Sequence, residues 1–142
     1  MILPDLNLLL YAYNSDAPKH ERAKTWWETC LSDTRAVGLP WAVIVGYLRL
    51  MTTRGVQREP APMPEAITHV RSWLERPQVE ILTPGPRHLD LIDGLLRDAR
   101  ASGNLAVDAH LAALAIENNA EVHSNDSDFS RFPGLRWIDP LA

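Results

Sequence analysis

Cysteines, a signal-like start and long apolar runs are scarce or missing in this sequence of 142 residues. The single cysteine, Cys30, excludes a disulfide within one chain and a zinc site built from several cysteines, and it suits the reducing cytoplasm. The opening residues Met1 to Asp5 lack the basic start of a signal peptide. No apolar run approaches the roughly 18 residues that a transmembrane helix needs. We therefore expect a cytoplasmic protein that does not enter a membrane.

Positive charge is also scarce. Lysine and arginine together number 14 against 18 aspartates and glutamates, which gives a net charge of −4. A surface that coats nucleic acid is usually strongly basic, so the overall charge argues against such a surface. If the substrate is a polyanion, a divalent cation held by carboxylates would neutralise it locally and would also explain the excess of acids.

The length and the apolar content suit one domain over residues 1–142. Hydrophobic residues make up 46% of the chain, which is enough for a core without disulfides. Short apolar segments alternate with helical patterns, and Gly55 to Pro64 is predicted to be a surface loop. Strands are predicted up to residue 5 and at 37–39, 79–82, 121–124 and 136–138. Helices are predicted after residue 5, at 19–31, 40–51, 65–74 and 108–116, and from Arg87 until Gly103-Asn104, with Leu89 among its inward residues. This alternation predicts an α/β fold in three layers, with a short central parallel sheet flanked by helices.

Three acidic positions that lie far apart in the sequence are predicted to meet. Asp5 and the pair Asp126 and Asp128 follow strands directly, and Asp108 lies at the start of a helix. In parallel sheets, ligands bind outside the carboxyl ends of the strands. Clustered carboxylates repel one another, so they persist where a cation or a shared proton compensates their charge. Carboxylate oxygens suit Mg²⁺ or Mn²⁺, and a metal held there would support hydrolysis of a phosphodiester.

The segments around these acids resemble one known family. The matching pieces are Leu3-Pro4-Asp5-Leu6-Asn7-Leu8-Leu9-Leu10-Tyr11, Asp108-Ala109-His110-Leu111-Ala112-Ala113-Leu114-Ala115 and Ser124-Asn125-Asp126-Ser127-Asp128-Phe129. Together they resemble the PIN-domain nucleases, and most closely the VapC toxins of bacterial toxin–antitoxin pairs. The resemblance spans nearly the whole chain, with the pieces in the family's order and spacing.

The resemblance implies a function and a set of site residues. It implies a Mg²⁺-dependent endoribonuclease toxin, often acting on structured RNA such as tRNA, that is commonly homodimeric and is neutralised by a cognate VapB-like antitoxin. It also assigns Asp5, Asp108 and Asp126 to the catalytic metal site. Asp128 is a candidate further ligand, because it shares the turn with Asp126.

One helix departs from the family pattern. PIN nucleases usually carry a glutamate on the helix that here reads Trp41-Ala42-Val43-Ile44-Val45-Gly46-Tyr47-Leu48-Arg49, and Gly46 takes that place. Asp128 or additional waters would then complete the coordination, which predicts a single well-bound metal. The alternative is a PIN fold that has lost catalysis and acts by binding protein alone.

Several further residues are candidates for supporting roles. Asn7 and Ser124 would orient the carboxylates or a metal-bound water, although both also suit turns. Arg49 would contact phosphate, although an exposed arginine needs no such role. The histidines show no ligand spacing, and we assign them none. A phosphoacceptor receiver domain needs a lysine late in the chain, and the only lysines are Lys19 and Lys24.

Overall fold

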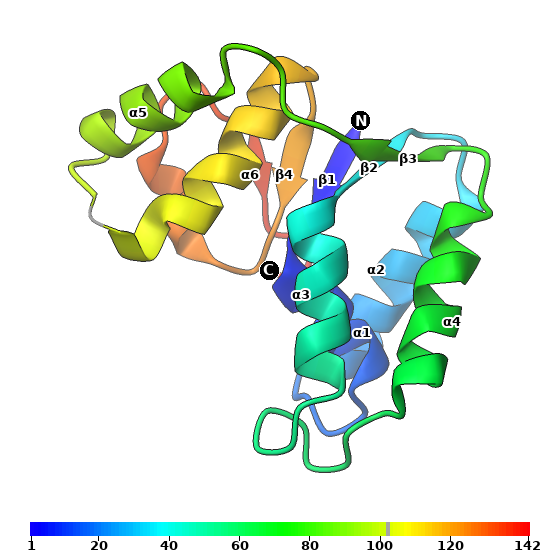
Figure 1. The fold of residues 1–142 in the computed structure, drawn as a ribbon. Helices are drawn as coiled ribbons and strands as arrows, with labels where there is room; N and C mark the ends of the chain where they lie inside the picture. The colour runs from blue at the N-terminus through cyan, green and yellow to red at the C-terminus, as the bar shows by residue number, and fades with distance from the viewer. Residues whose placement is uncertain (102) are drawn as a thin grey trace.

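A parallel sheet of five strands forms the centre of the molecule (Figure 1). The computed structural model describes residues 1–101 and 103–142. The strands are β1 (Ile2–Pro4), β2 (Val37–Pro40), β3 (Val79–Leu82), β4 (Glu121–His123) and β5 (Trp137–Ile138). All neighbouring pairs are parallel, in the order β3-β2-β1-β4-β5. Every residue of β1 and β2 is buried, as expected for strands that are covered on both faces.

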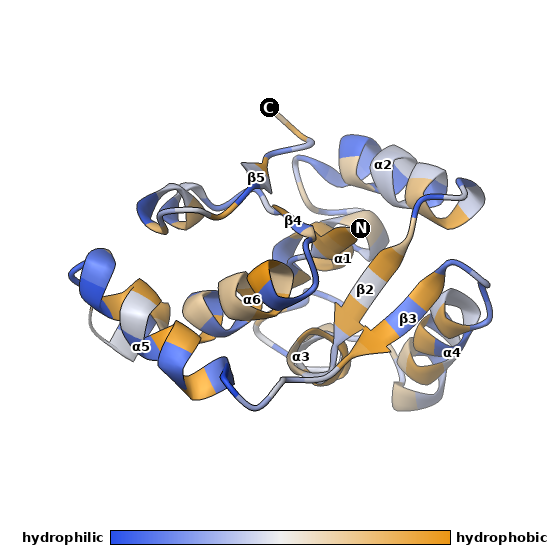
Figure 2. Cartoon of the chain, turned by 90° about the horizontal axis from the view of Figure 1, so that it is seen from above, coloured by the Kyte–Doolittle hydropathy of each residue, from blue (hydrophilic) through white to orange (hydrophobic). Residues whose placement is uncertain are grey.

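Helices cover both faces of this sheet. They are α1 (Leu6–Tyr13), α2 (His20–Ser32), α3 (Trp41–Met51), α4 (Met63–Leu74), α5 (His88–Asp98) and α6 (Ala106–Glu117), with the 3₁₀ helices η1 (Gly103–Leu105) and η2 (Ser127–Arg131). Figure 2 shows α2 on one side of the strands, and α3, α5 and α6 on the other. The predicted three-layer α/β/α fold is confirmed. Among the described residues, no helix is both long and apolar enough to cross a membrane.

The order of the strands reverses at β1. The chain runs from β1 to β2 and β3 on one side, and then returns through α5 and α6 to β4 and β5 on the other side. In register, Leu3 of β1 pairs with Val122 of β4, so the carboxyl ends of these two strands lie side by side. Open α/β sheets bind ligands at such a reversal. Asp5 follows β1 here, and the loop with Asp126 follows β4.

Helix α5 differs from its sequence prediction in two ways. It ends at Asp98 rather than at Gly103-Asn104, because the chain turns at Arg100, which has a left-handed backbone with φ of 51°. Leu89 does not face inward, since 76% of its surface is exposed. The preceding residue, His88, turns its ring toward α6 instead, and successive residues on a helix point about 100° apart.

Gly38 in β2 lies where the sheet leaves no room for a side chain. A Cβ at this position would lie 2.5 Å from Leu82 Cδ1, 2.7 Å from Leu82 Cγ and 3.0 Å from Met1 Sδ. Because Leu82 is itself buried, we expect Gly38→Ala to lower the free energy of unfolding by about 1–3 kcal/mol in urea denaturation. Gly94→Ala in α5 is the matched control, since a Cβ there meets nothing within 4 Å. Equal losses in both variants would contradict this packing argument.

Candidate active site

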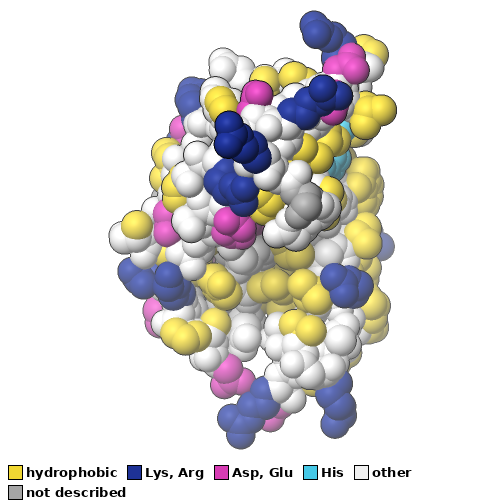
Figure 3. Space-filling model, turned by 90° about the vertical axis from the view of Figure 1, so that its left-hand side faces the viewer, with side chains coloured by type: hydrophobic (Ala, Val, Ile, Leu, Met, Phe, Trp, Pro, Cys, Tyr) yellow, Lys and Arg dark blue, Asp and Glu magenta, His cyan; other side chains and the backbone are white. Residues whose placement is uncertain are grey.

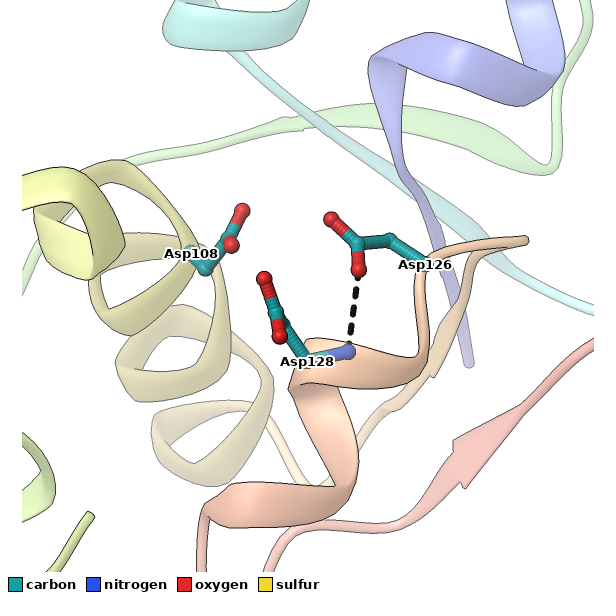
Figure 4. Close-up of side chains that lie close together, drawn as sticks. All are labelled: Asp108, Asp126 and Asp128. Carbon is teal, nitrogen blue, oxygen red and sulfur yellow. Dashed lines mark hydrogen bonds between the residues drawn. The ribbon is translucent and has the colours of Figure 1, made fainter.

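Three carboxylates converge beyond the carboxyl edge of the sheet (Figure 4). One oxygen from each of Asp108, Asp126 and Asp128 lies within 4.8 Å of the others, and all three residues are half-buried. Asp108 comes from the first turn of α6, whereas Asp126 and Asp128 come from the start of η2. Figure 4 shows the three side chains pointing toward a common space. We refer to these three residues as the carboxylate cluster.

A local hydrogen bond explains why Asp126 and Asp128 lie on the same side. Asp126 is the N-cap of η2, and its Oδ1 accepts a hydrogen bond of 2.9 Å from the Asp128 backbone N–H. An aspartate that accepts from the backbone two residues later forms a tight turn. The turn therefore directs both carboxylates toward α6.

Asp5 lies at the edge of this cluster. It is the N-cap of α1, where Oδ1 accepts a hydrogen bond of 2.7 Å from the Leu6 N–H, and Oδ2 accepts one of 2.6 Å from the Ser124 hydroxyl. Asp5 lines the same cavity as Asp108 and Asp126. The structure thus brings Asp128 into the close group and places Asp5 beside it, whereas the sequence ranked Asp5 above Asp128.

The fully buried Ser124 connects the acids of the site. Its hydroxyl donates to Asp5, accepts from the Asp126 N–H at 3.0 Å and accepts from Asn7 Nδ2 at 3.3 Å. A hydroxyl can donate one hydrogen bond and accept two, so the Ser124 hydroxyl makes all the hydrogen bonds that it can make. The other end of the same amide, Asn7 Oδ1, is buried and has no hydrogen-bond partner among the described residues.

Burial and mutual repulsion disturb the titration of these acids. The pKa of Asp108 is raised to about 6, first by burial and then by the charges of Asp5, Asp126 and Asp128. The pKa of Asp5 is raised chiefly by burial, although the hydrogen bonds from Ser124 and Leu6 oppose this rise. Oxygen donors gathered at such an electrostatic cost fit a hard divalent cation such as Mg²⁺ or Mn²⁺. The residues present therefore suit a metal ion.

Asp5, Asp108 and Asp126 share a cavity of about 310 Å³ with apolar side chains. Besides Asp5, Asn7, Asp108 and Asp126, the lining consists of Leu6, Leu10, Ala42, Val43, Leu50, Val107 and Leu111. Every lining residue that α3 contributes is apolar. A larger open hollow of about 640 Å³ lies beside Leu31 and Gln78 and contains none of the carboxylate cluster.

Helix α3 carries Arg49, a predicted phosphate contact, and Gly46, which stands in the place of the glutamate usual in PIN nucleases. Arg49 is exposed and is not among the residues that line the cavity. Gly46 lies against α1, because a Cβ there would be 2.7 Å from Leu6 Cδ2. The Leu6 side chain therefore fills the space that a side chain at position 46 would take. Helix α3 supplies no acid to the site.

The sequence did not indicate two groups of polar contacts. His88 lies between Glu117 and His110, with a hydrogen bond to Glu117 and 2.7 Å between His88 Nε2 and His110 Nδ1. The spacing of seven residues between His110 and Glu117, two turns of one helix, is the signal that could have indicated this contact. Beside the site, Lys19 Nζ donates a hydrogen bond of 3.0 Å to Asn125 Oδ1, a contact between residues 106 positions apart.

Removing the Ser124 hydroxyl tests whether it holds the acids in place. Ser124→Ala would leave Asp5 Oδ2 and the Asp126 N–H without their partner. We expect the free energy of unfolding to fall by about 1–3 kcal/mol and Mn²⁺ affinity to fall about tenfold in a calorimetric titration. Ser127→Ala, which alters an exposed serine of the same turn, is the control and should change neither quantity. The role of Ser124 is refuted if the two variants behave alike.

Comparisons with known proteins place the chain among relatives along its whole length. The sequence profile of the PIN domain matches residues 2–135. Ribonuclease VapC33 of Mycobacterium tuberculosis is 46% identical over 141 residues, which cover 99% of each chain. Ribonuclease VapC37 of the same organism is 40% identical over 142 residues, covering 100% of this chain and 99% of that protein.

Solved structures share the fold at lower sequence identity. VapBC-1 from nontypeable Haemophilus influenzae superposes with a TM-score of 0.70 and 18% identity, covering both chains completely. VapC20 of Mycobacterium tuberculosis, described as a sarcin-ricin loop cleaving toxin, has a TM-score of 0.66 and 21% identity, and the match covers 96% of this chain and 99% of that one. VapBC2 from Rickettsia felis, solved bound to a DNA fragment of its promoter, has a TM-score of 0.69 and 17% identity over 97% of this chain and 98% of that one.

Proposed function

The chain belongs to the PIN domain family, in the group of the VapC ribonucleases, and on this premise we propose that residues 1–142 form a PIN domain that acts as a metal-dependent endoribonuclease toxin. The observation that carries the proposal is the carboxylate cluster at the reversal of the strand order, where Asp108, Asp126 and Asp128 converge. Relatives over the full length are named ribonucleases, which supports RNA as the substrate.

The side chains of the site suit metal-assisted hydrolysis of a phosphodiester. Asp108, Asp126 and Asp128 would hold Mg²⁺, or Mn²⁺ in its place. When bound, the ion would supply charge neutralisation at the phosphate and a water of lowered pKa. Ser124 keeps Asp5 Oδ2 fixed beside the cluster by donating its only hydrogen to it. Because the acids are half-buried, their charges are screened less by water than those of fully exposed acids.

A single metal is the stoichiometry we propose. Gly46 stands where a further acid is expected, and Leu6 fills the space above it. With Asp128 in the close group, the described acids gather around one point rather than two. Titration calorimetry with Mn²⁺ should therefore give one tight site per chain.

We also propose a VapB-like antitoxin and a second copy of the chain as partners. Structures with the same fold were solved as VapBC complexes, which supports the antitoxin. Trp41 and Val45, one turn apart on α3, are 53% and 57% exposed. Hydrophobic side chains also gather on the face seen from the side of α5 (Figure 3). Exposed apolar surface of this kind is typical of an interface, so it supports a homodimer.

The alternative function is a PIN fold without catalysis that acts by binding protein. Gly46 motivates it, because one expected acid is missing. The three gathered carboxylates argue against it, since a binding module has no need to maintain repelling charges at a cost in stability.

RNA cleavage by purified protein separates these two functions. Wild type is expected to cut RNA with Mg²⁺ or Mn²⁺, whereas Asp5→Ala and Asp108→Ala should lose the activity. Asp90→Ala, which removes an exposed acid of α5, is the control and should cut like wild type. If wild type cuts no RNA with any divalent metal, or if both site variants cut as well as wild type, the nuclease proposal is wrong.

A further inference from the structure

The cavity beside the carboxylate cluster is lined by two kinds of side chain. Asp5, Asp108 and Asp126 are acidic. The residues that α1 and α3 contribute include Leu6, Leu10, Ala42, Val43 and Leu50, which are apolar and which we refer to as the apolar wall. A metal site alone gives no reason for an apolar wall, because hard cations and their waters prefer oxygen donors.

The apolar wall is closed where α1 crosses α3. Leu6 covers Gly46, with its Cδ2 only 2.7 Å from the position of a Gly46 Cβ, and both Leu6 and Leu10 line the cavity. An acidic side chain at position 46 would have to displace Leu6. With glycine at position 46, Leu6 keeps its place against α3, and the residues that α3 contributes to the cavity carry no charge.

We propose that this cavity binds one unstacked nucleotide of the substrate, with its base against the apolar wall of α1 and α3. The proposal rests on the ribonuclease function, which places a phosphate at the carboxylate cluster. A nucleotide joins a charged phosphate to a flat base with apolar faces, and these match the carboxylate cluster with its metal and the apolar wall in turn. The cavity of about 310 Å³ lies at the lower end of the range for small-ligand sites. Recognition of this kind selects single-stranded or looped RNA, whose bases are free to leave the stack.

Binding of small probes to the Mg²⁺-loaded, full-length chain tests the wall. The probes are the four nucleoside 5′-monophosphates and ribose 5-phosphate, which carries a hydroxyl in place of the base. In titrations followed by methyl NMR, at least one nucleotide is expected to bind about tenfold more tightly than ribose 5-phosphate, a gain within the range found for base contacts. The methyl groups of Leu6, Leu10 and Leu50 should shift with the nucleotide and not with ribose 5-phosphate.

Variants assign the effect to individual residues. Leu50→Gln should remove the advantage of the base and leave the affinity for ribose 5-phosphate unchanged. Ala42→Gln, at an exposed lining position, should do the same with little effect on folding. Leu89→Gln, on exposed α5, is the matched control and should change nothing.

Several results would overturn this inference. Equal affinity for nucleotides and ribose 5-phosphate, methyl shifts confined to other surfaces, or no binding of any probe would each reject the base-binding wall. If RNA is cut in a metal-dependent way and the base still adds nothing, only this inference fails. If Leu50→Gln instead weakens binding of the antitoxin and not of nucleotides, the wall is a protein-binding surface.

Discussion

Asp108→Asn is expected to reduce metal-dependent RNA cleavage on the order of a thousandfold and, at the same time, to stabilise the metal-free protein. The amide keeps the shape of the carboxylate but removes a charge that Asp5, Asp126 and Asp128 repel. A substitution that lowers activity but raises stability indicates that the charges are held together in order to bind a ligand. The melting temperature without metal and the cleavage rate with Mg²⁺ measure the two effects.

The pH dependence of folding follows from the burial of Asp108 and from the same repulsion. The pKa of Asp108 rises from 3.8 to about 6 in the folded protein, chiefly through burial. Between these values the folded state keeps a proton that the unfolded state has lost, so this group's contribution to stability is present at low pH and is lost as pH rises through 6. The gain in melting temperature from Asp108→Asn should therefore be larger at pH 7.5 than at pH 4.5.

Mg²⁺ provides the second half of this test. A ligand that binds only the folded state raises its stability, so Mg²⁺ should raise the melting temperature of wild type and have little effect on Asp108→Asn. Asp90→Asn, at an exposed position on α5, should respond to Mg²⁺ like wild type. A destabilised Asp108→Asn protein, or one that Mg²⁺ stabilises as much as wild type, would be inconsistent with repulsion relieved by a metal.

Trp73→Ala should cause the largest loss of stability. Trp73 is fully buried among aromatic rings, with centroid distances of 4.7 Å to Tyr47, 5.6 Å to Trp27 and 5.7 Å to Tyr13. Its Nε1 also donates a hydrogen bond of 2.8 Å to the Tyr13 hydroxyl. Truncation of such a side chain costs about 3–5 kcal/mol, which is a large part of the stability of a protein of this size.

Urea denaturation of matched tryptophan variants measures this loss. Trp41→Ala removes an equally large side chain that is 53% exposed, so it should cost well under half as much. Trp73→Phe keeps a ring but loses the donor to Tyr13, and it should fall between wild type and Trp73→Ala. Similar losses for Trp41→Ala and Trp73→Ala would show that the aromatic cluster does not hold α4 to the rest of the fold.

Much of the architecture was accessible from the sequence. The alternation of apolar strands with helical patterns predicted the parallel sheet, because strands that are buried on both faces read as short continuous apolar runs. The rule that ligands bind beyond carboxyl strand ends then brought Asp5, Asp108 and Asp126 together, and the structure places all three along one cavity. Their roles in metal binding and catalysis stay predictions until they are measured.

The details that the sequence could not supply depend on contacts between distant segments. The turn that links Asp126 and Asp128 is local, but whether it faces Asp108 depends on how η2 packs against α6. The periodicity of the apolar residues predicted wrongly that Leu89 faces inward. Periodicity carries no information on the contact between His88 and α6, which sets the orientation of this helix turn. Gly46 indicated a missing acid, but the leucine that fills its place comes from α1, forty residues earlier.

The position of Mn²⁺ in crystals of the wild-type chain, located by its anomalous scattering, tests most directly whether the carboxylate cluster holds a divalent metal. The expected result is one peak among Asp108, Asp126 and Asp128, which disappears in crystals of Asp108→Asn grown in the same way. No peak at saturating Mn²⁺, or a peak held by other residues while these three acids stay unbound, would contradict a metal-dependent active site at this edge of the sheet.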